Sequence, residues 1–205
     1  AQCQLARPAA VTGGRGVSKP FTVAMVAGMP YPMAKASVIR VNHIVRSLVS
    51  RYPDVKIKLF AYRGAAEPAT HPQVELHLTG GFDAKKENYY SWGNKLAADF
   101  RIIRELIRHR GQFDLIHCHT IEGLFMAQAF RLLALRRVPV CIDVHGPIVA
   151  EMVHYGLIPD WKPAVAAVST CEKWMLSSVA RAFVSNEGLR ETDRKSTRLN
   201  SSHQI

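Results

Sequence analysis

The sequence predicts an α/β protein with a doubly wound, mostly parallel Rossmann-like sheet and helices on both faces. Two observations predict this fold. Short apolar segments of strand length alternate with longer segments that have the apolar spacing of amphipathic helices. The first of the short segments is apolar on consecutive residues, as expected of a strand that is covered on both faces. The chain has 205 residues, 48% of them hydrophobic, which is enough for one such domain.

The expected elements follow one another in regular order. The first strand is Phe21–Ala27, and a loop with Gly and Pro, Gly28–Lys35, separates it from the first helix, Ala36–Arg51. Val74–Leu78 alternates apolar and polar residues, which favours a position at the sheet edge. The other expected strands are Val55–Tyr62, Asp114–Cys118, Val138–Val144 and Ala180–Ser185, and the other expected helices are Asn94–Arg110, a segment between Thr120 and Val138, and a segment within Trp161–Val179.

The two ends of the chain differ in composition from the part between them. Residues 1–20 are rich in Gly, Ala, Pro and Arg, and we expect a disordered leader there. Residues 21–190 are expected to form the domain. The segment Asp193–His203 (DRKSTRLNSSH) resembles the translation of a common sequencing adapter. Residues 191–205 are therefore interpreted as a non-native or disordered tail, and we expect the natural sequence to continue past about Thr192.

The formal net charge of +11 indicates an anionic partner. Seven arginines lie on two of the predicted helices, where they form either a solvated surface or a peripheral contact with anionic lipids at the inner face of a membrane. No nucleic-acid partner is predicted, because no binding module is recognisable and aromatic residues do not alternate with the basic ones. The seven residues are Arg40, Arg46, Arg51, Arg101, Arg104, Arg108 and Arg110.

The four cysteines, Cys3, Cys118, Cys141 and Cys171, lie far apart and form no C-x-x-C pair. Cys118 and Cys141 fall in predicted strands, where a thiol behaves as a small buried hydrophobic group. The sequence shows no secretory signal and no apolar run of the ~20 residues that span a bilayer. Together these features predict a cytoplasmic protein with reduced thiols.

Turn-forming and polar residues follow two of the predicted strands, at the edge where a parallel sheet binds ligands. Gly28, Pro30 and Tyr31 precede a helix N-terminus, which favours anions. Their loop is not G-x-G-x-x-G, and this argues against a nicotinamide cofactor. His145 and Gly146 end a later strand, where glycine allows a sharp turn and the close approach of a ligand.

His117 and His119 lie two residues apart on one face of a strand, roughly 7 Å from each other. We expect His119, nearer the strand end, to face a cleft and His117 to be partly buried. No metal is predicted, because such a site needs further ligands that the sequence does not identify. Glu122 opens the next helix, where the dipole favours a carboxylate, and is a candidate contact for a ligand. The remaining histidines considered are interpreted as surface or core residues: His43, His71, His77, His109 and His154.

The segment Phe113–Gly146 combines FDLIHCHT, an Ala- and Leu-rich helix and VPVCIDVHG. It resembles the N-terminal, acceptor-side domain of GT-B glycosyltransferases of the family 4 type. Members of that family commonly carry a D-hydrophobic-hydrophobic-H-x-H strand, such a helix, and a strand that closes on H-G. The resemblance spans roughly Phe21 to Arg190 and implies that the predicted sheet is one half of a GT-B fold.

The resemblance implies transfer of a sugar from a nucleotide-sugar donor, a co-substrate rather than a cofactor, to a sugar or lipid-linked acceptor, with retention of configuration. It implies that the C-terminal donor-binding domain is missing, so the fragment alone is expected to be inactive. The matching histidine, His145, is the catalytic candidate, as a positioning and electrostatic group. Two alternatives remain: a non-catalytic ligand-binding domain and a fragment of a GT-B nucleotide-sugar epimerase. The candidate substrate-binding residues are Gly28, Pro30, Tyr31, His119, Glu122 and Gly146.

Overall fold

The computed structural model describes residues 19–32, 36–64, 71–81, 92–144 and 161–184, together with residues 149, 153 and 159. Six strands in this part of the chain form one sheet in the order β3-β2-β1-β4-β5-β6, and every neighbouring pair is parallel. The predicted doubly wound parallel sheet is confirmed. The strands are β1 (Thr22–Tyr31), β2 (Lys56–Arg63), β3 (Val74–Gly81), β4 (Leu115–His119), β5 (Val140–Val144) and β6 (Arg181–Val184).

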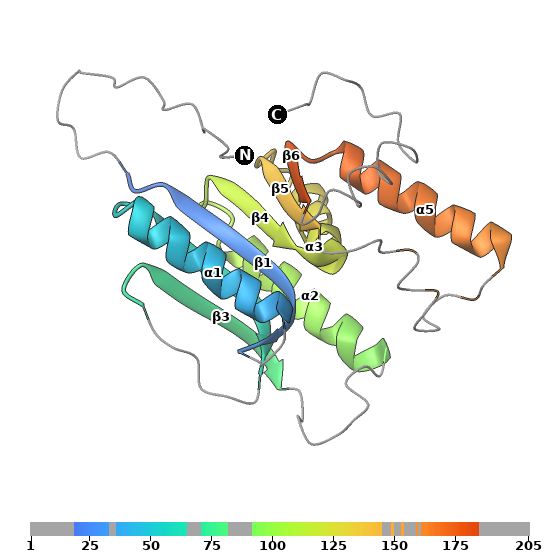
Figure 1. Ribbon diagram of the computed structural model, residues 1–205, viewed down its shortest axis with the longest axis horizontal. Coiled ribbons are helices and arrows are strands. Elements are labelled where there is room, and N and C mark those ends of the chain that lie inside the picture. The colour runs from blue at the N-terminus through green and yellow to red at the C-terminus, as the bar shows by residue number, and fades with distance from the viewer. Residues whose placement is uncertain are drawn as a thin grey trace.

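Helices cover both faces of the sheet, as predicted. Helix α1 lies in front of the sheet, and helices α2 and α3 lie behind it (Figure 1). Alternate residues of β1 divide the hydrophobic core between the two faces, because successive strand side chains point to opposite sides. Met25 packs with the α1 side, and Val26 packs with the side of α2, α3 and α5. The helix bounds are α1 (Ala36–Arg51), α2 (Trp92–Arg108), α3 (Thr120–Leu133) and α5 (Lys162–Ser177).

The first strand is longer than the sequence predicts. β1 continues to Tyr31, so Gly28, Pro30 and Tyr31 lie in the strand and not in the expected Gly28–Lys35 loop. Its pairing with β2 shifts register between Ala27 and Pro30. Such an irregularity accommodates a proline, which cannot donate a ladder hydrogen bond. The strand continues because Met29 and Tyr31, each 7% exposed, still pack in the core.

The structure also shows the surroundings of the two cysteines in predicted strands. Cys118 and Cys141 are buried free thiols, as expected. Burial raises the pKa of the Cys118 thiol and raises that of the Cys141 thiol to about 12, so both groups are protonated and unreactive near neutrality.

Among the described helices, none is long and apolar enough to cross a bilayer. Residues 1–18 of the expected leader and the whole of the expected tail, residues 191–205, lie outside the described residues.

Helix α3 packs closely against β1 through Gly123. A Cβ atom at this position would lie 2.5 Å from the carbonyl oxygen of Val26, which is backbone and cannot rotate away. We expect Gly123→Ala to lower the free energy of unfolding by about 1–3 kcal/mol, the usual cost of overpacking, although alanine is the better helix former.

Urea denaturation of the purified chain measures this effect. The matched control is Gly93→Ala in the first turn of α2, where an added Cβ meets no atom within 4 Å. The control is expected to be neutral or stabilising by up to about 1 kcal/mol. Equal effects of the two substitutions would contradict the packing argument.

Candidate functional site at the carboxyl edge of the sheet

The chain changes direction between β1 and β4, which are neighbours in the sheet. The helix after β1 covers one face, and the helix after β4 covers the other. In open α/β sheets this arrangement leaves a crevice at the carboxyl ends of the two strands, where ligands bind. We call this place the edge site and define it by Gly28, His119, Thr120 and Glu122.

Glycine at position 28 lets β1 approach the first turn of α3. A Cβ atom at Gly28 would lie 2.6 Å from the Cβ of Glu122 and 3.3 Å from the backbone nitrogen of Gly123. The group that approaches Gly28 closely is therefore a helix of the same chain. Gly28 and Glu122, both predicted as site residues, are brought together by this packing.

The N-terminus of α3 has unusual backbone geometry. Thr120 has a φ of 73°, in the left-handed region that β-branched residues rarely adopt. The helix has no side-chain cap, so its first N–H groups lack the partner that a capping side chain provides. The buried hydroxyl Oγ1 of Thr120 has no hydrogen-bond partner among the described residues. Strained backbone of this kind is often found at functional sites, and uncapped N–H groups favour an anion or a polar oxygen.

A buried ion pair lies beside the edge site. Arg40 of α1 makes a bidentate contact with Asp143 of β5, with its Nη2 2.6 Å from Oδ1 of the carboxylate. Asp143 is only 1% exposed, whereas the Arg40 side chain is 37% exposed. The Nδ1 atom of His119 lies 3.9 Å from Oδ2 of Asp143. The carboxylate therefore links α1 to the end of β4.

His117 and His119 lie on the same face of β4, with ring centroids 4.5 Å apart. Contrary to the prediction, His119 is fully buried, with 0% exposure, and the 8% exposed His117 lines a groove. The pKa of His117 is lowered to about 4, chiefly by burial; the charge of Asp143 opposes this shift and that of Arg40 adds to it. The His117 ring is therefore neutral at physiological pH, and a neutral imidazole can donate one hydrogen bond and accept another.

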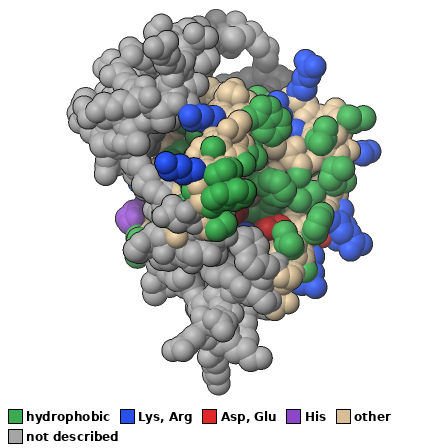
Figure 2. Space-filling model, turned by 90° about the vertical axis from the view of Figure 1, so that its right-hand side faces the viewer, with side chains coloured by type: hydrophobic (Ala, Val, Ile, Leu, Met, Phe, Trp, Pro, Cys, Tyr) green, Lys and Arg blue, Asp and Glu red, His purple; other side chains and the backbone are tan. Residues whose placement is uncertain are grey.

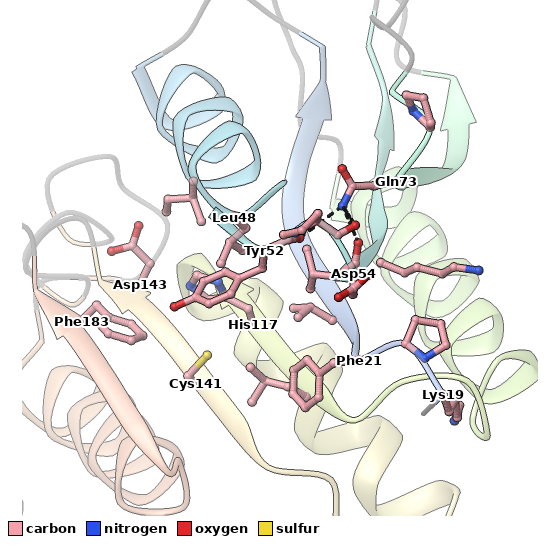
Figure 3. Close-up of a pocket in the computed structure, with 18 of the residues that line it drawn as sticks. Lys19, Phe21, Leu48, Tyr52, Asp54, Gln73, His117, Cys141, Asp143 and Phe183 are labelled. Carbon is pink, nitrogen blue, oxygen red and sulfur yellow. Dashed lines mark hydrogen bonds between the residues drawn. The ribbon is translucent and has the colours of Figure 1, made fainter. Parts of the chain in front are cut away.

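The groove, of about 1350 Å³, runs along the α1 face of the sheet. Figure 3 shows His117, Cys141, Asp143 and Phe183 at one end of it, and Lys19, Phe21 and Gln73 at the other. The end of the groove lined by Lys19 and Phe21 lies beside the amino ends of β1 and β2. The groove thus reaches the ion pair but extends away from the edge site, toward the amino ends of the strands. Ligands of parallel sheets usually bind at the opposite edge, at the carboxyl ends of the strands.

The structure places the other predicted residues differently. Tyr31 is buried, and its hydroxyl donates to Oδ1 of Asn42 at 2.6 Å; burial raises the pKa of this hydroxyl above its ordinary value. Its side chain therefore braces β1 against α1. Pro30 pairs with Tyr62 of β2 within the sheet. His145 and Gly146, the strongest candidates from the sequence, lie outside the described residues.

Sequence reasoning missed Arg40 and Asp143 as members of this region. The sequence pattern places Arg40 on a basic helix surface, but in the structure it pairs with Asp143. The signal for Asp143 was present in the sequence VCIDV: a carboxylate in an otherwise apolar strand must be paired, because an isolated buried charge is too costly.

Comparison with known proteins gives one family match and several similar folds. Residues 36–195 match the family model described as a glycosyl transferase 4-like domain. The sucrose-phosphate synthase of Thermosynechococcus elongatus superposes with a TM-score of 0.59 at 12% identity, covering 85% of this chain and 45% of that chain. This chain therefore spans less than half the length of that protein.

Two other structures superpose less well. The lipopolysaccharide outer core galactosyltransferase WaaB, in its apo form, gives a TM-score of 0.41 at 9% identity, covering 60% of this chain and 32% of that one. A ugt transferase from Siraitia grosvenorii, in complex with UDP, gives 0.40 at 10% identity, covering 64% and 30%. Among curated proteins there is no significant match.

Proposed function

The chain belongs to the family of glycosyl transferase 4-like domains, and from this premise we propose that it is the acceptor-side half of an enzyme that transfers a sugar from a nucleotide-sugar donor. The observation that carries the proposal is the coincidence of the family match with a strained, uncapped helix N-terminus at the switch point between β1 and β4. We further propose that the transfer retains anomeric configuration and needs no cofactor.

In this proposal the edge site binds the acceptor or the transferred sugar. The first N–H groups of α3 and the Thr120 hydroxyl offer hydrogen bonds to sugar oxygens or phosphate. The Glu122 carboxylate accepts hydrogen bonds from sugar hydroxyls, while Gly28 leaves room for the helix to lie close to β1. His119 helps to form the buried floor of the site, beside Asp143.

The remaining predicted residues take more limited roles. Pro30 and Tyr31 would contact substrate through their backbone, because the Tyr31 side chain is buried against α1. His145, followed by Gly146, is proposed to position the sugar at the reacting face and to stabilise charge that develops there. This assignment rests on the family resemblance of the sequence VHG.

We propose that the donor nucleotide is held by a second domain that faces the edge site. The exposed apolar surface supports such a contact: hydrophobic side chains gather, among basic ones, on the side of the molecule that carries α5 (Figure 2). Large exposed apolar residues at the start of α5 and within it are Trp161 and Trp174, with 64% and 66% exposure. Surfaces of this kind commonly mark interfaces.

We also propose a cytoplasmic location with peripheral contact to anionic lipid. The exposed arginines of α2, such as Arg101 and Arg104, support this contact. The arginines of α1 lie on the opposite face of the sheet, so the two basic sets do not form one surface. Helix α2 is the better candidate for the lipid contact, because Arg40 of α1 forms an ion pair with Asp143.

A transfer assay tests the proposed function. The complete natural reading frame that contains this chain is incubated with a panel of radiolabelled UDP-, GDP- and ADP-sugars and with sugar and lipid-linked acceptors. We expect label transfer from one donor class by the complete protein and none by residues 1–205 alone. Binding of ligand without transfer by the complete protein would favour a ligand-binding domain, and inversion at C2 or C4 of the free nucleotide-sugar would favour an epimerase. Either result would overturn the proposal.

A further inference from the structure

A cluster of metal-ligating side chains lies far from the edge site, between the edge strand β3 and the end of α2. Glu75 and His77 are two residues apart on β3, so their side chains share one face of the sheet. His109 follows directly after the last residue of α2. One ligand atom from each of the three residues lies within 4.8 Å of the other two.

The two histidine rings are held in place by neighbours. The His77 ring stacks on Phe60, with centroids 4.6 Å apart and an interplanar angle of 13°. The Nδ1 atom of His109 lies 3.1 Å from Oε1 of Gln112. A side-chain amide oxygen can only accept, so Nδ1 of His109 donates and the lone pair of its Nε2 atom remains for another partner. Such an outer hydrogen bond is typical of metal-ligating histidines.

The Glu75 carboxylate contacts two neighbouring side chains. Oε2 of Glu75 contacts the ammonium group of Lys58, and Oε1 lies 2.9 Å from Nε2 of His77. Glu75 and His77 therefore meet through these two atoms, and a ring nitrogen of His109 lies within 4.8 Å of a ligand atom of each. The Glu75 side chain is 55% exposed, so water can reach these atoms and supply a further ligand.

We propose that Glu75, His77 and His109 form a binding site for one divalent transition-metal ion of the zinc class. Two imidazoles and one carboxylate suit zinc and cobalt, whereas magnesium and calcium prefer oxygen ligands. Zinc–ligand distances are about 2.0–2.2 Å, so the three ligand atoms, which lie within 4.8 Å of one another, would draw closer together around one ion. The bound ion would tie the edge strand β3 to the end of α2. This proposal does not depend on the proposed transferase function.

Lys58 gives the proposal a sharp discriminating test. Its charge lies beside the Glu75 carboxylate and opposes a cation at the site. Lys58→Met keeps the length of the side chain and removes the charge, so it is expected to tighten metal binding. If Glu75 serves only as the partner of Lys58 and His77, the same substitution produces no metal binding at all.

Equilibrium dialysis of the purified 205-residue chain against zinc, followed by elemental analysis, measures the stoichiometry. We expect one zinc ion per chain and a tighter affinity in Lys58→Met. In His77→Gln and in His109→Gln we expect an affinity at least about 10- to 100-fold weaker, because the loss of a ligand costs no less than the loss of an outer-shell partner. The matched control is His43→Gln, which removes an exposed histidine from α1 on the other face of the sheet and is expected to leave zinc binding unchanged.

Cobalt provides a second readout that does not depend on stability. Its visible absorption spectrum reports histidine coordination, and circular dichroism of each variant verifies that it is folded. No zinc bound by the wild-type chain at micromolar concentration, or equal binding by the wild type and the folded His77→Gln and His109→Gln variants, would overturn the proposal.

Discussion

Arg40→Ala is expected to lower the free energy of unfolding by about 3 kcal/mol, one of the two largest effects that the structure predicts. Asp143 is 1% exposed and receives a bidentate contact from Arg40. Removal of the guanidinium leaves a buried carboxylate without its main compensating charge. The expected cost lies at the lower end of the range for buried pairs, because the Arg40 side chain is 37% exposed.

Urea denaturation of the wild type and the variant measures this cost. The double variant Arg40→Met, Asp143→Leu removes both charges and is expected to recover most of the lost stability, since apolar replacement of a buried pair is often neutral. Arg46→Ala, on the exposed side of the same helix, is the control and is expected to change stability by less than about 0.5 kcal/mol. An Arg40→Ala variant as stable as this control would contradict the assigned role of the ion pair.

The second large effect is a pH dependence of stability caused by His117. Burial lowers its pKa from 6.5 to about 4 in the folded chain. Between these values the unfolded chain binds a proton that the folded chain does not, so stability rises with pH. The contribution is fully present above pH 6.5 and is lost as the pH falls towards 4. The shift corresponds to about 3 kcal/mol.

Unfolding free energies measured from pH 7 to pH 4 test this effect. Carboxylates also titrate in this range, so the informative quantity is the difference between the wild type and His117→Gln. The wild type is expected to lose about 3 kcal/mol more than the variant over this range. His43→Gln, which removes an exposed histidine, is expected to follow the wild type. Parallel profiles for wild type and His117→Gln would show that the imidazole is not excluded from water as the structure indicates.

Much of the fold could be predicted from local sequence patterns. Both ends of α1 follow from its apolar spacing and from Pro53 after it, and the sheet follows from the alternation of strands and helices. The family resemblance identified from Phe113–Gly146 is confirmed by the match over residues 36–195. The end of β1 was predicted wrongly, because Pro30 and Pro32 are turn signals in sequence, whereas a register shift accommodates Pro30 within the sheet.

The candidate site was less predictable because it depends on contacts between distant residues. Position along β4 favours His119 as the exposed histidine, but exposure is decided by what covers the strand. Arg40 and Asp143 are 103 residues apart in sequence, and no local pattern shows that they meet over the end of β4. The same holds for His77 and His109, which the sequence separates and the packing of α2 on β3 brings together.

The location of the substrate site is the central claim, and one measurement tests it most directly. In the complete reading frame, the rate of sugar transfer is compared for the wild type, Glu122→Gln at the edge site and Tyr52→Ala at the amino-end side of the groove. Glu122→Gln keeps the shape of the side chain and removes its charge, and Tyr52 is 44% exposed. We predict at least a tenfold loss of kcat/KM in Glu122→Gln, about 1.4 kcal/mol of transition-state stabilisation, and an unchanged value in Tyr52→Ala. Unchanged transfer by Glu122→Gln together with a large loss in Tyr52→Ala would place the substrate in the groove and contradict the claim.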